Sequence, residues 1–392
     1  MIAYLDNNAT TCVAPEVMDA MAPFFTERYG NPSSMHAFGG MIARDIEKAR
    51  ETVAAFINAE PDEILFTSCA TESDNTAIRG TAEFLGRDAQ VVTTAVEHPA
   101  VLQPARRLKA EGHDEVVLPV DGVGQLDLER LRDALNGGRK SLVSVMWANN
   151  ETGTVFPIEK VAEIAKEHGA VMHTDAVQAA GKAPIDAKKV PFDLLSISGH
   201  KFHAPKGVGI LFVRRGTKMK PFMLGGHQER GRRAGTENVP YIIGLAKACE
   251  LAAADMASES VRLAKMRDRL EAGILASCPN VRVNGDVAHR LSNTLNVGFE
   301  YIEGEAIAYR LSDLGICIST GSACASGSLD PSHVIRAMGV PFTALHGSIR
   351  FSLSRYTTDA EIDYVLEHLP KVIGALREMS PFGPGKPGCC QT

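Results

Sequence analysis

The sequence predicts an α/β protein with a mostly parallel central sheet in a large domain and a second, smaller α+β domain. Three observations carry this prediction. The chain has 392 residues, more than one hydrophobic core usually serves. Short apolar runs alternate with amphipathic stretches of helical length up to about residue 213, which is typical of a parallel sheet covered on both faces. Beyond Pro240 a long helical stretch and then mixed strands and helices follow.

The first long helix is predicted from apolar residues that recur at steps of three or four. Ile42, Ile46, Ala49, Val53 and Phe56 would form one apolar face. Strands are then predicted at 63–67, 90–95, 115–118, 141–147, 170–174, 193–197 and 208–213, with helices at 71–86, 99–111, 127–136 and 157–168. Sites in such sheets form at the carboxyl ends of strands, so polar residues that follow a strand are the first functional candidates.

The second domain is predicted from the changed pattern of the last third of the chain. A helical region at 240–277, with a possible break at 257–260, precedes a strand at 293–299, a helix at 303–314, a Gly/Ser-rich loop at 319–329, a strand at 348–353 and a helix at 359–379. We expect the large domain to span 15–258 and the small domain to combine 1–14 with 259–380. The Pro/Gly-rich segment 381–392 is expected to be a disordered tail.

Composition and charge argue against several classes of protein. The net charge of −6 does not suit a general nucleic-acid binder. No apolar run approaches the roughly 20 residues that span a bilayer, and no basic leader is present, so a cytoplasmic location is expected. The eight cysteines are scattered, without the spacing of a metal site, so we expect no bound metal.

A lysine and an aspartate at the ends of two predicted strands point to a cofactor. Lys201 follows the apolar run 192–197, and burial lowers the pKa of an amine, which makes it able to form an imine with an aldehyde. Asp175 ends the strand-like run that begins near Val171. A pyridoxal phosphate site needs both an imine-forming lysine and an acid that faces the pyridinium nitrogen. The sequence therefore predicts such a site.

Four other features are ambiguous on their own. Segment 68–74 opens a helix and could bind a phosphate through free amides, or it could be an ordinary capped helix. His98 could stack on a ring and transfer protons, or it could be a lone structural histidine. Arg350 could bind a carboxylate or form a structural ion pair. Cys324 lies among small residues, either as a nucleophile on a mobile arm or as an incidental thiol in a linker.

Several long motifs resemble one enzyme family. They are Gly30-Asn31-Pro32-Ser33-Ser34, Ala70-Thr71-Glu72-Ser73, Asn149-Asn150-Glu151-Thr152-Gly153, Ser198-Gly199-His200-Lys201 and Gly321-Ser322-Ala323-Cys324. From Tyr4 to about residue 380 the chain resembles the cysteine desulfurases, pyridoxal phosphate enzymes of the class V aminotransferase group with the fold-type-I (aspartate aminotransferase-like) architecture. Segment 227–238 and the long Ser/Gly arm around Cys324 are most similar to the nitrogen-fixation, NifS-like branch.

The resemblance implies catalytic roles for Lys201, His98 and Cys324, a cofactor-binding role for Asp175 and a substrate-binding role for Arg350. Lys201 would form the imine with the cofactor aldehyde, and Asp175 would pair with the pyridinium nitrogen. His98 would stack on the ring and transfer protons. Arg350 would bind the substrate carboxylate, and Cys324 would accept sulfur.

The resemblance also implies a cofactor-binding set. Asn150 would contact the ring or the substrate, and Gln178 would contact the ring hydroxyl. The residues assigned to the phosphate are Ala70, Thr71, Ser198, His200 and, from the partner subunit of a homodimer, Thr236.

The implied reaction removes sulfur from L-cysteine, gives L-alanine and leaves a persulfide on Cys324. The sulfur would supply iron–sulfur cluster assembly through a NifU-like scaffold protein, with nitrogenase as the expected recipient. Two alternatives stay open: another pyridoxal phosphate enzyme on this fold, such as a selenocysteine lyase or an aminotransferase, and a non-catalytic sulfur carrier. Cys389 and Cys390 lie outside the family pattern, either in a tail without a role or as a thiol relay.

Overall fold

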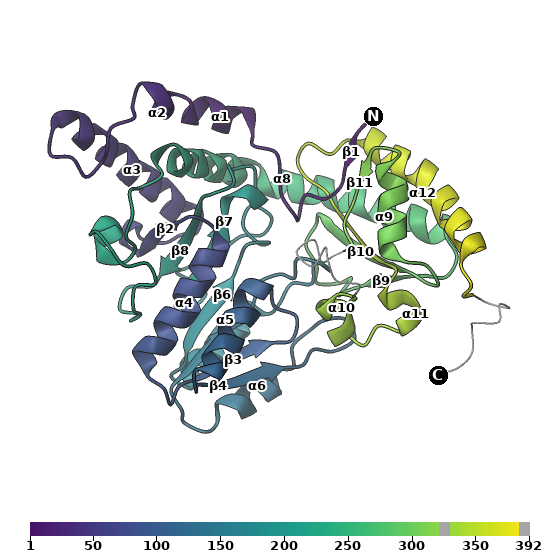
Figure 1. The fold of residues 1–392 in the computed structure, drawn as a ribbon, viewed down its shortest axis with the longest axis horizontal. Helices are drawn as coiled ribbons and strands as arrows, with labels where there is room; N and C mark the ends of the chain where they lie inside the picture. Colours follow the sequence, from purple (N-terminus) through teal and green to yellow (C-terminus); the bar gives the residue numbers. More distant parts are fainter. Residues whose placement is uncertain (321–329, 384–392) are drawn as a thin grey trace.

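A seven-stranded sheet forms the centre of the larger part of the molecule (Figure 1). The computed structural model describes residues 1–320 and 330–383. The strand order is β2-β8-β7-β6-β5-β3-β4, and only β8 runs antiparallel to its neighbours among these strands. The strands are β2 (Ile64–Thr67), β3 (Gln90–Thr94), β4 (Asp114–Leu118), β5 (Ser141–Ser144), β6 (Val171–Asp175), β7 (Leu194–Ser198) and β8 (Gly209–Val213). The predicted mostly parallel sheet is therefore confirmed.

Helices cover both faces of this sheet because its strands are buried on both sides. On β2, Ile64 and Phe66 join the core that contains α3, whereas Leu65 between them joins the core beneath α4. The helices that precede or connect the strands are α1 (Pro15–Met21), α2 (Pro23–Thr26), α3 (Ala37–Phe56), α4 (Ala70–Leu85), α5 (Pro99–Ala110), α6 (Leu128–Leu135) and α7 (Ile158–Glu167). The predicted apolar face of α3 packs into the main core.

A second core lies around a three-stranded antiparallel sheet of order β12-β10-β9. Helices α9 and α12 pack beside it (Figure 1). The elements of this part are β9 (Val281–Asn284), β10 (Thr294–Phe299), α9 (Gly304–Ser312), β11 (Ile316–Cys317), α10 (His333–Ala337), α11 (Phe342–Leu345), β12 (Ser348–Ser352) and α12 (Asp359–Met379). Strand β9 was not predicted from the sequence. The residue boundaries of the two domains, 15–258 and 1–14 with 259–380, remain predictions.

One helix joins the two cores. Helix α8 (Val239–Ser277) is continuous, so the possible break at 257–260 is absent. These four residues include neither glycine nor proline, so nothing in the backbone requires an interruption. Leu245 packs in the main core and Leu270 in the second one.

The N-terminal segment also bridges both parts. Strand β1 (Ala3–Tyr4) pairs in parallel with β11. The chain then returns to the large sheet, where the Thr11 amide donates to the His200 carbonyl oxygen at 3.0 Å. Residues 5–11 therefore cross the junction between the cores, beside the carboxyl end of β7.

Three of the eight cysteines, and most of the segment predicted to be a tail, lie outside the described residues. These are Cys324, in segment 321–329, and Cys389 and Cys390, in segment 384–392. Among the described helices, none has the length and apolar character needed to cross a bilayer. No cluster of described side chains has the composition of a metal site.

Candidate active site

Lys201 ends the short 3-10 turn η2 (Gly199–Lys201), which follows β7 directly. Its amine donates to the carbonyl oxygens of Asn8 at 2.7 Å and Ala9 at 2.8 Å. Both carbonyls belong to the N-terminal segment that crosses the sheet edge. The lysine therefore stands at the end of a buried strand with its amine held in place, as the strand pattern suggested.

Asp175 is the last residue of β6, the parallel neighbour of β7, and it lies opposite Ser196 in the ladder. Its carboxylate is buried and accepts the Val177 amide at 2.9 Å. Burial raises the pKa of Asp175 to about 6, although the Val177 hydrogen bond and the charge of Lys201 lower it. The protein thus leaves this carboxylate only partly compensated, which suits a cationic ring nitrogen as its partner.

Gln178 belongs to the turn that follows β6. Its Nε2 donates to the Asn8 carbonyl oxygen at 3.0 Å, the same oxygen that accepts from Lys201. Its Oε1 accepts from the amine of Lys182 at 3.0 Å. The structure therefore brings Gln178 and Lys201, two predicted site residues, to one carbonyl group.

His98 is the N-cap of α5, and its Nδ1 accepts the Ala100 amide at 3.1 Å. This bond places the proton of a neutral imidazole on Nε2. Burial, followed by the charges of Lys201 and His333, lowers the pKa of His98 to about 4. His98 is therefore neutral at physiological pH, with Nε2–H as a donor.

The residues predicted to hold a phosphate emerge on both sides of Gly209. Thr67 at the end of β2 and Ser198 at the end of β7 both pair with Gly209, the first residue of β8. A Cβ on Gly209 would lie 2.6 Å from the Ile197 carbonyl oxygen and 3.0 Å from the Cys69 carbonyl carbon. Only glycine lets the two strand ends approach so closely.

This approach places two groups of donors near each other. Ala70 begins α4, whose N-cap residue Cys69 makes no side-chain capping bond, so the first amides of the helix remain available for an anion. Thr71 follows in the same turn and is exposed. His200 bonds Thr10 Oγ1 through Nδ1 at 3.1 Å, which leaves Nε2 for another partner.

Arg350 lies on β12, at the junction of the two cores. Its guanidinium donates to the Asn150 carbonyl oxygen at 2.8 Å and to Asp6 Oδ1 at 2.7 Å. Its Nε is buried and has no partner among the described residues. The Nε–H of this buried arginine thus remains for an anionic acceptor, which suits a carboxylate.

Thr236 lies in an exposed loop and lines a different cavity from Lys201. It lines a cavity of about 150 Å³ together with Thr67, Ser68 and Arg233. The cavity therefore joins this loop to the chain that leads into α4. Whether Thr236 serves the partner subunit, as the resemblance implies, remains a prediction.

The ends of the cysteine arm are anchored, although Cys324 itself lies outside the described residues. Ser319 pairs with Arg350 through two backbone hydrogen bonds of 3.3 and 2.7 Å. On the other side, Ser332 donates to the buried Glu151 carboxylate at 2.5 Å. His333 Nε2 then contacts the Glu97 carbonyl oxygen at 2.9 Å. Ser319 and Ser332, which flank the arm on its two sides, therefore both lie near Arg350 and Asn150.

Sequence reasoning missed two buried acids near the site. Both carboxylate oxygens of Asp74 are buried without a hydrogen-bond partner among the described residues, and Oδ1 lies 3.5 Å from His173 Nε2. Burial, followed by the charge of Asp175, raises the pKa of Asp74 well above its ordinary value. Burial raises the pKa of Glu97 to about 8, against hydrogen bonds from Thr94 and Met146. Their positions within the motifs that contain Ala70 and His98 were the only available signal.

The described residues fit pyridoxal phosphate. Asp175 offers a buried carboxylate that lacks a strong cation, and Lys201 offers an amine at the same edge of the sheet. The close approach at Gly209 brings the start of α4 near η2, and both segments would offer donors to a phosphate. The pair that would bind the ring and the donors that would bind the phosphate therefore occur together.

Comparison with known proteins agrees with this chemistry. A sequence model of the family described as Aminotransferase class-V matches residues 3–365. A curated cysteine desulfurase of Trichormus azollae is 55% identical over 390 residues, which cover 100% of this chain and 97% of the relative. The cysteine desulfurase NifS of Azotobacter vinelandii is 55% identical over 383 residues, which cover 97% of this chain and 95% of the relative.

Solved structures give the same picture. A protein described as NifS-like superposes with a TM-score of 0.90 at 40% identity, covering 96% of this chain and 100% of that chain. A structure of SspA in complex with cysteine superposes with a TM-score of 0.80 at 34% identity, covering 91% of this chain and 100% of that chain. The fold-type-I architecture expected from the sequence is therefore confirmed.

Proposed function

The chain belongs to the aminotransferase class-V family, and we propose that it is a pyridoxal phosphate-dependent cysteine desulfurase, which removes sulfur from L-cysteine and releases L-alanine. The observation that carries this proposal is the Lys201 amine beside the buried Asp175 carboxylate at one edge of the sheet. The relatives at 55% identity over nearly the whole chain support the desulfurase activity in preference to amino-group transfer.

The residues around Lys201 handle protons and charge. When bound, pyridoxal phosphate supplies an electron sink for the negative charge that forms on the substrate α-carbon. Asp175 would keep the ring nitrogen protonated, because its buried carboxylate would gain a cationic partner. Lys201 Nζ takes the α-proton of the bound cysteine, and the neutral His98 holds a proton at Nε2 for transfer. Gln178 would contact the ring hydroxyl.

Substrate binding and sulfur transfer use the junction between the two cores. The Nε of Arg350, which has no partner among the described residues, donates to the substrate carboxylate, close to Asn150. The Cys324 thiolate attacks the substrate Sγ, the Cβ–Sγ bond breaks with its electron pair left on the carbon skeleton, and a persulfide remains on Cys324. The role of Cys324 rests on the resemblance, because this residue lies outside those described.

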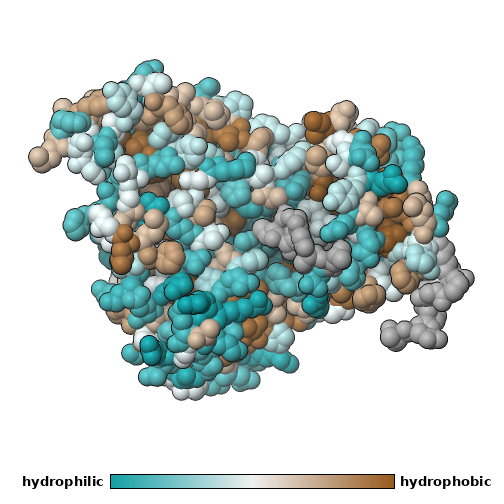
Figure 2. Space-filling model, viewed as in Figure 1, coloured by the Kyte–Doolittle hydropathy of each residue, from teal (hydrophilic) through white to brown (hydrophobic). Residues whose placement is uncertain are grey.

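Two features support a homodimer. Large apolar side chains stand exposed near the start of the chain and in the loop after β8, among them Phe25, Tyr29, Met35 and Leu224, whose relative exposures are 54%, 70%, 104% and 83%. Figure 2 shows brown and tan side chains over the end of the molecule where α1, α2 and α3 lie. Thr236 is exposed in the same region of the sequence as Leu224, where a partner's phosphate could meet it. Light scattering should give twice the 42.0 kDa chain mass, and Leu224→Asp should lower it.

The sulfur acceptor follows from the resemblance alone. A NifU-like iron–sulfur scaffold protein is the proposed acceptor, with nitrogenase as the recipient suggested by the NifS name of one relative. The cytoplasmic location expected from the sequence is likewise part of this proposal.

The function is tested by mixing the purified protein with L-cysteine and a reductant. Sulfide and alanine should appear in equal amounts. Cys324→Ala should bind the cofactor normally and release no alanine, whereas Lys201→Ala should lose the covalently attached cofactor. Pyruvate formed from alanine would favour an aminotransferase, and alanine release at the normal rate by Cys324→Ala would refute the persulfide route. Purified protein that binds no pyridoxal phosphate at all would favour a sulfur carrier.

A further inference from the structure

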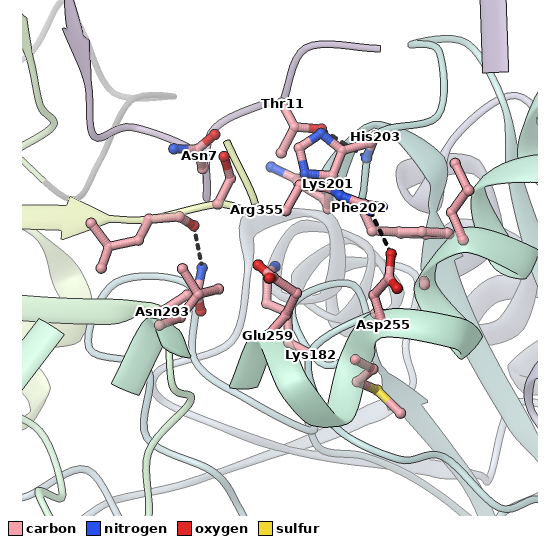
Figure 3. Close-up of a pocket in the computed structure, with 17 residues that line it drawn as sticks. Asn7, Thr11, Lys182, Lys201, Phe202, His203, Asp255, Glu259, Asn293 and Arg355 are labelled. Atoms are coloured by element: carbon pink, nitrogen blue, oxygen red, sulfur yellow. Dashed lines mark hydrogen bonds and ion pairs between the residues drawn. The ribbon is translucent and has the colours of Figure 1, made fainter. Parts of the chain in front are cut away.

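Lys182 is joined to Lys201 by an unbroken series of hydrogen bonds that the proposed mechanism does not use. The Lys182 amine donates to Gln178 Oε1 at 3.0 Å, Gln178 Nε2 donates to the Asn8 carbonyl oxygen at 3.0 Å, and that oxygen also accepts from Lys201 at 2.7 Å. Lys182 and Lys201 line one cavity of about 60 Å³ (Figure 3). No residue between Gln178 and Lys182 bears a side chain that could replace this contact, because they are alanine and glycine.

We propose that Lys182 is a positioning residue for the cofactor, which fixes the side-chain amide of Gln178 in one of its two orientations. An ammonium group has only donors and a carbonyl oxygen only accepts. Lys182 on one side and the Asn8 carbonyl on the other therefore both require Oε1 toward Lys182 and Nε2 toward the site. In a reversed amide, Nε2 would face the Lys182 ammonium, which is also a donor, and Oε1 would face the Asn8 carbonyl oxygen, which is also an acceptor.

The fixed orientation matters because of the second hydrogen on Nε2. One hydrogen goes to Asn8, so the other is directed at whatever acceptor enters the site. For the proposed function, on which this inference rests, that acceptor is the oxygen substituent of the pyridine ring. Without Lys182 the amide could turn its oxygen toward the same atom and repel it.

The surroundings of Lys182 leave its amine to Gln178. Burial, followed by the charges of Lys201 and Arg350, lowers the pKa of Lys182 to about 7, so the donor-only ammonium form that fixes Gln178 prevails below that pH, where the binding test is made. Asp255, Glu259, His203 and Arg355 line the same cavity, but Asp255 pairs with Arg355 and Glu259 with Arg262. The neighbouring carboxylates are thus engaged elsewhere, and Gln178 Oε1 is the acceptor of the Lys182 amine.

The test is a double-mutant cycle on cofactor affinity, measured on cofactor-free protein. The single tryptophan, Trp147, donates its amide to the Asp175 carbonyl oxygen at 2.8 Å, so its fluorescence reports pyridoxal phosphate at the site. Lys182→Met should raise the dissociation constant about tenfold, since a hydrogen bond to a charged group is worth about that much. Gln178→Leu should raise it at least as far. The double variant should match Gln178→Leu within about twofold, because Lys182 acts through Gln178.

Controls separate positioning from general stability. Lys189→Met removes an exposed lysine of the same segment and should leave the dissociation constant unchanged. Lys182→Arg keeps a donor-only cation and should stay within about threefold of the parent protein, and it serves as the test if Lys182→Met does not fold.

Three results would overturn the inference. These are an unchanged dissociation constant for Lys182→Met, a double variant whose loss is the product of the single losses, and a tenfold loss for Lys182→Arg. Failure of the parent protein to bind pyridoxal phosphate would instead refute the proposed function.

Discussion

Asp175→Asn should stabilise the cofactor-free protein, although it weakens binding of the cofactor. The buried carboxylate has a pKa raised from its ordinary 3.8 to about 6, chiefly by burial. This difference corresponds to on the order of 3 kcal/mol of lost stability once the folded protein has released the proton. Asparagine keeps an oxygen for the Val177 amide and carries no charge, so it removes this cost.

The sign and the pH range follow from the direction of the shift. Because the pKa is higher in the folded protein, the unfolded chain releases this proton first as the pH rises from about 4 to 6. The stability of the parent protein relative to Asp175→Asn therefore falls across this range and levels off above it. At pH 8 the variant should be more stable by about 3 kcal/mol, and near pH 4 the two should be equal.

Denaturant unfolding of cofactor-free protein between pH 4 and 8 measures this difference. Asp186→Asn is a matched control, because the Asn58 side chain and two backbone amides lower the pKa of Asp186. That control should lose stability at neutral pH. Adding pyridoxal phosphate at about 100 times its dissociation constant stabilises the parent by roughly 2.7 kcal/mol. The difference in stability between the two proteins should therefore become smaller or change sign. A cofactor-free Asp175→Asn protein that is less stable at pH 8, or a difference independent of pH, would refute the reasoning.

Three other substitutions have defined outcomes. Gly209→Ala should lower the free energy of unfolding by about 1–3 kcal/mol, measured by thermal unfolding, and weaken cofactor binding, because its Cβ would lie 2.6 Å from the Ile197 carbonyl oxygen. An unchanged cofactor affinity would count against the proposed phosphate site. Glu229→Gln should destabilise the protein by about 3–5 kcal/mol, because it breaks the buried pair with Arg50 at 2.9 Å; a cost below about 1 kcal/mol in denaturant unfolding would contradict this. Arg350→Lys should raise the KM for cysteine about 10- to 100-fold with the cofactor dissociation constant unchanged, because lysine cannot serve Asp6, Asn150 and a substrate together; an unchanged KM would exclude that role.

Much of the fold was predictable because its strands are short apolar runs separated by amphipathic helices. The predicted strand at 141–147 ends at Ser144, although Val145 and Trp147 continue to bond the backbone of β6. A run of apolar residues indicates that a segment is buried, and here the buried segment continues beyond the last residue of β5. Strand β9 escaped prediction because Val281–Asn284 mixes polar with half-buried apolar residues.

The site was predictable where side chains at strand ends carry the chemistry. Asp175 and Lys201 stand on adjacent parallel strands, so the strand pattern alone brings them to one edge. The carbonyl groups of Asn8 and Ala9, which hold Lys201, were not predictable. Backbone oxygens leave no signal in the sequence, and the contact joins segments more than 190 residues apart.

Helix α8 has a mechanical consequence for the whole molecule. Its 39 residues make a rod of about 58 Å, and between Leu245 and Ala272 it contains neither glycine nor proline. One half is embedded in each core, so the cores cannot swing apart like a clamshell without bending this strut. Arg350, beside the second core, and Lys201, beside the large sheet, are thereby held at a nearly constant separation.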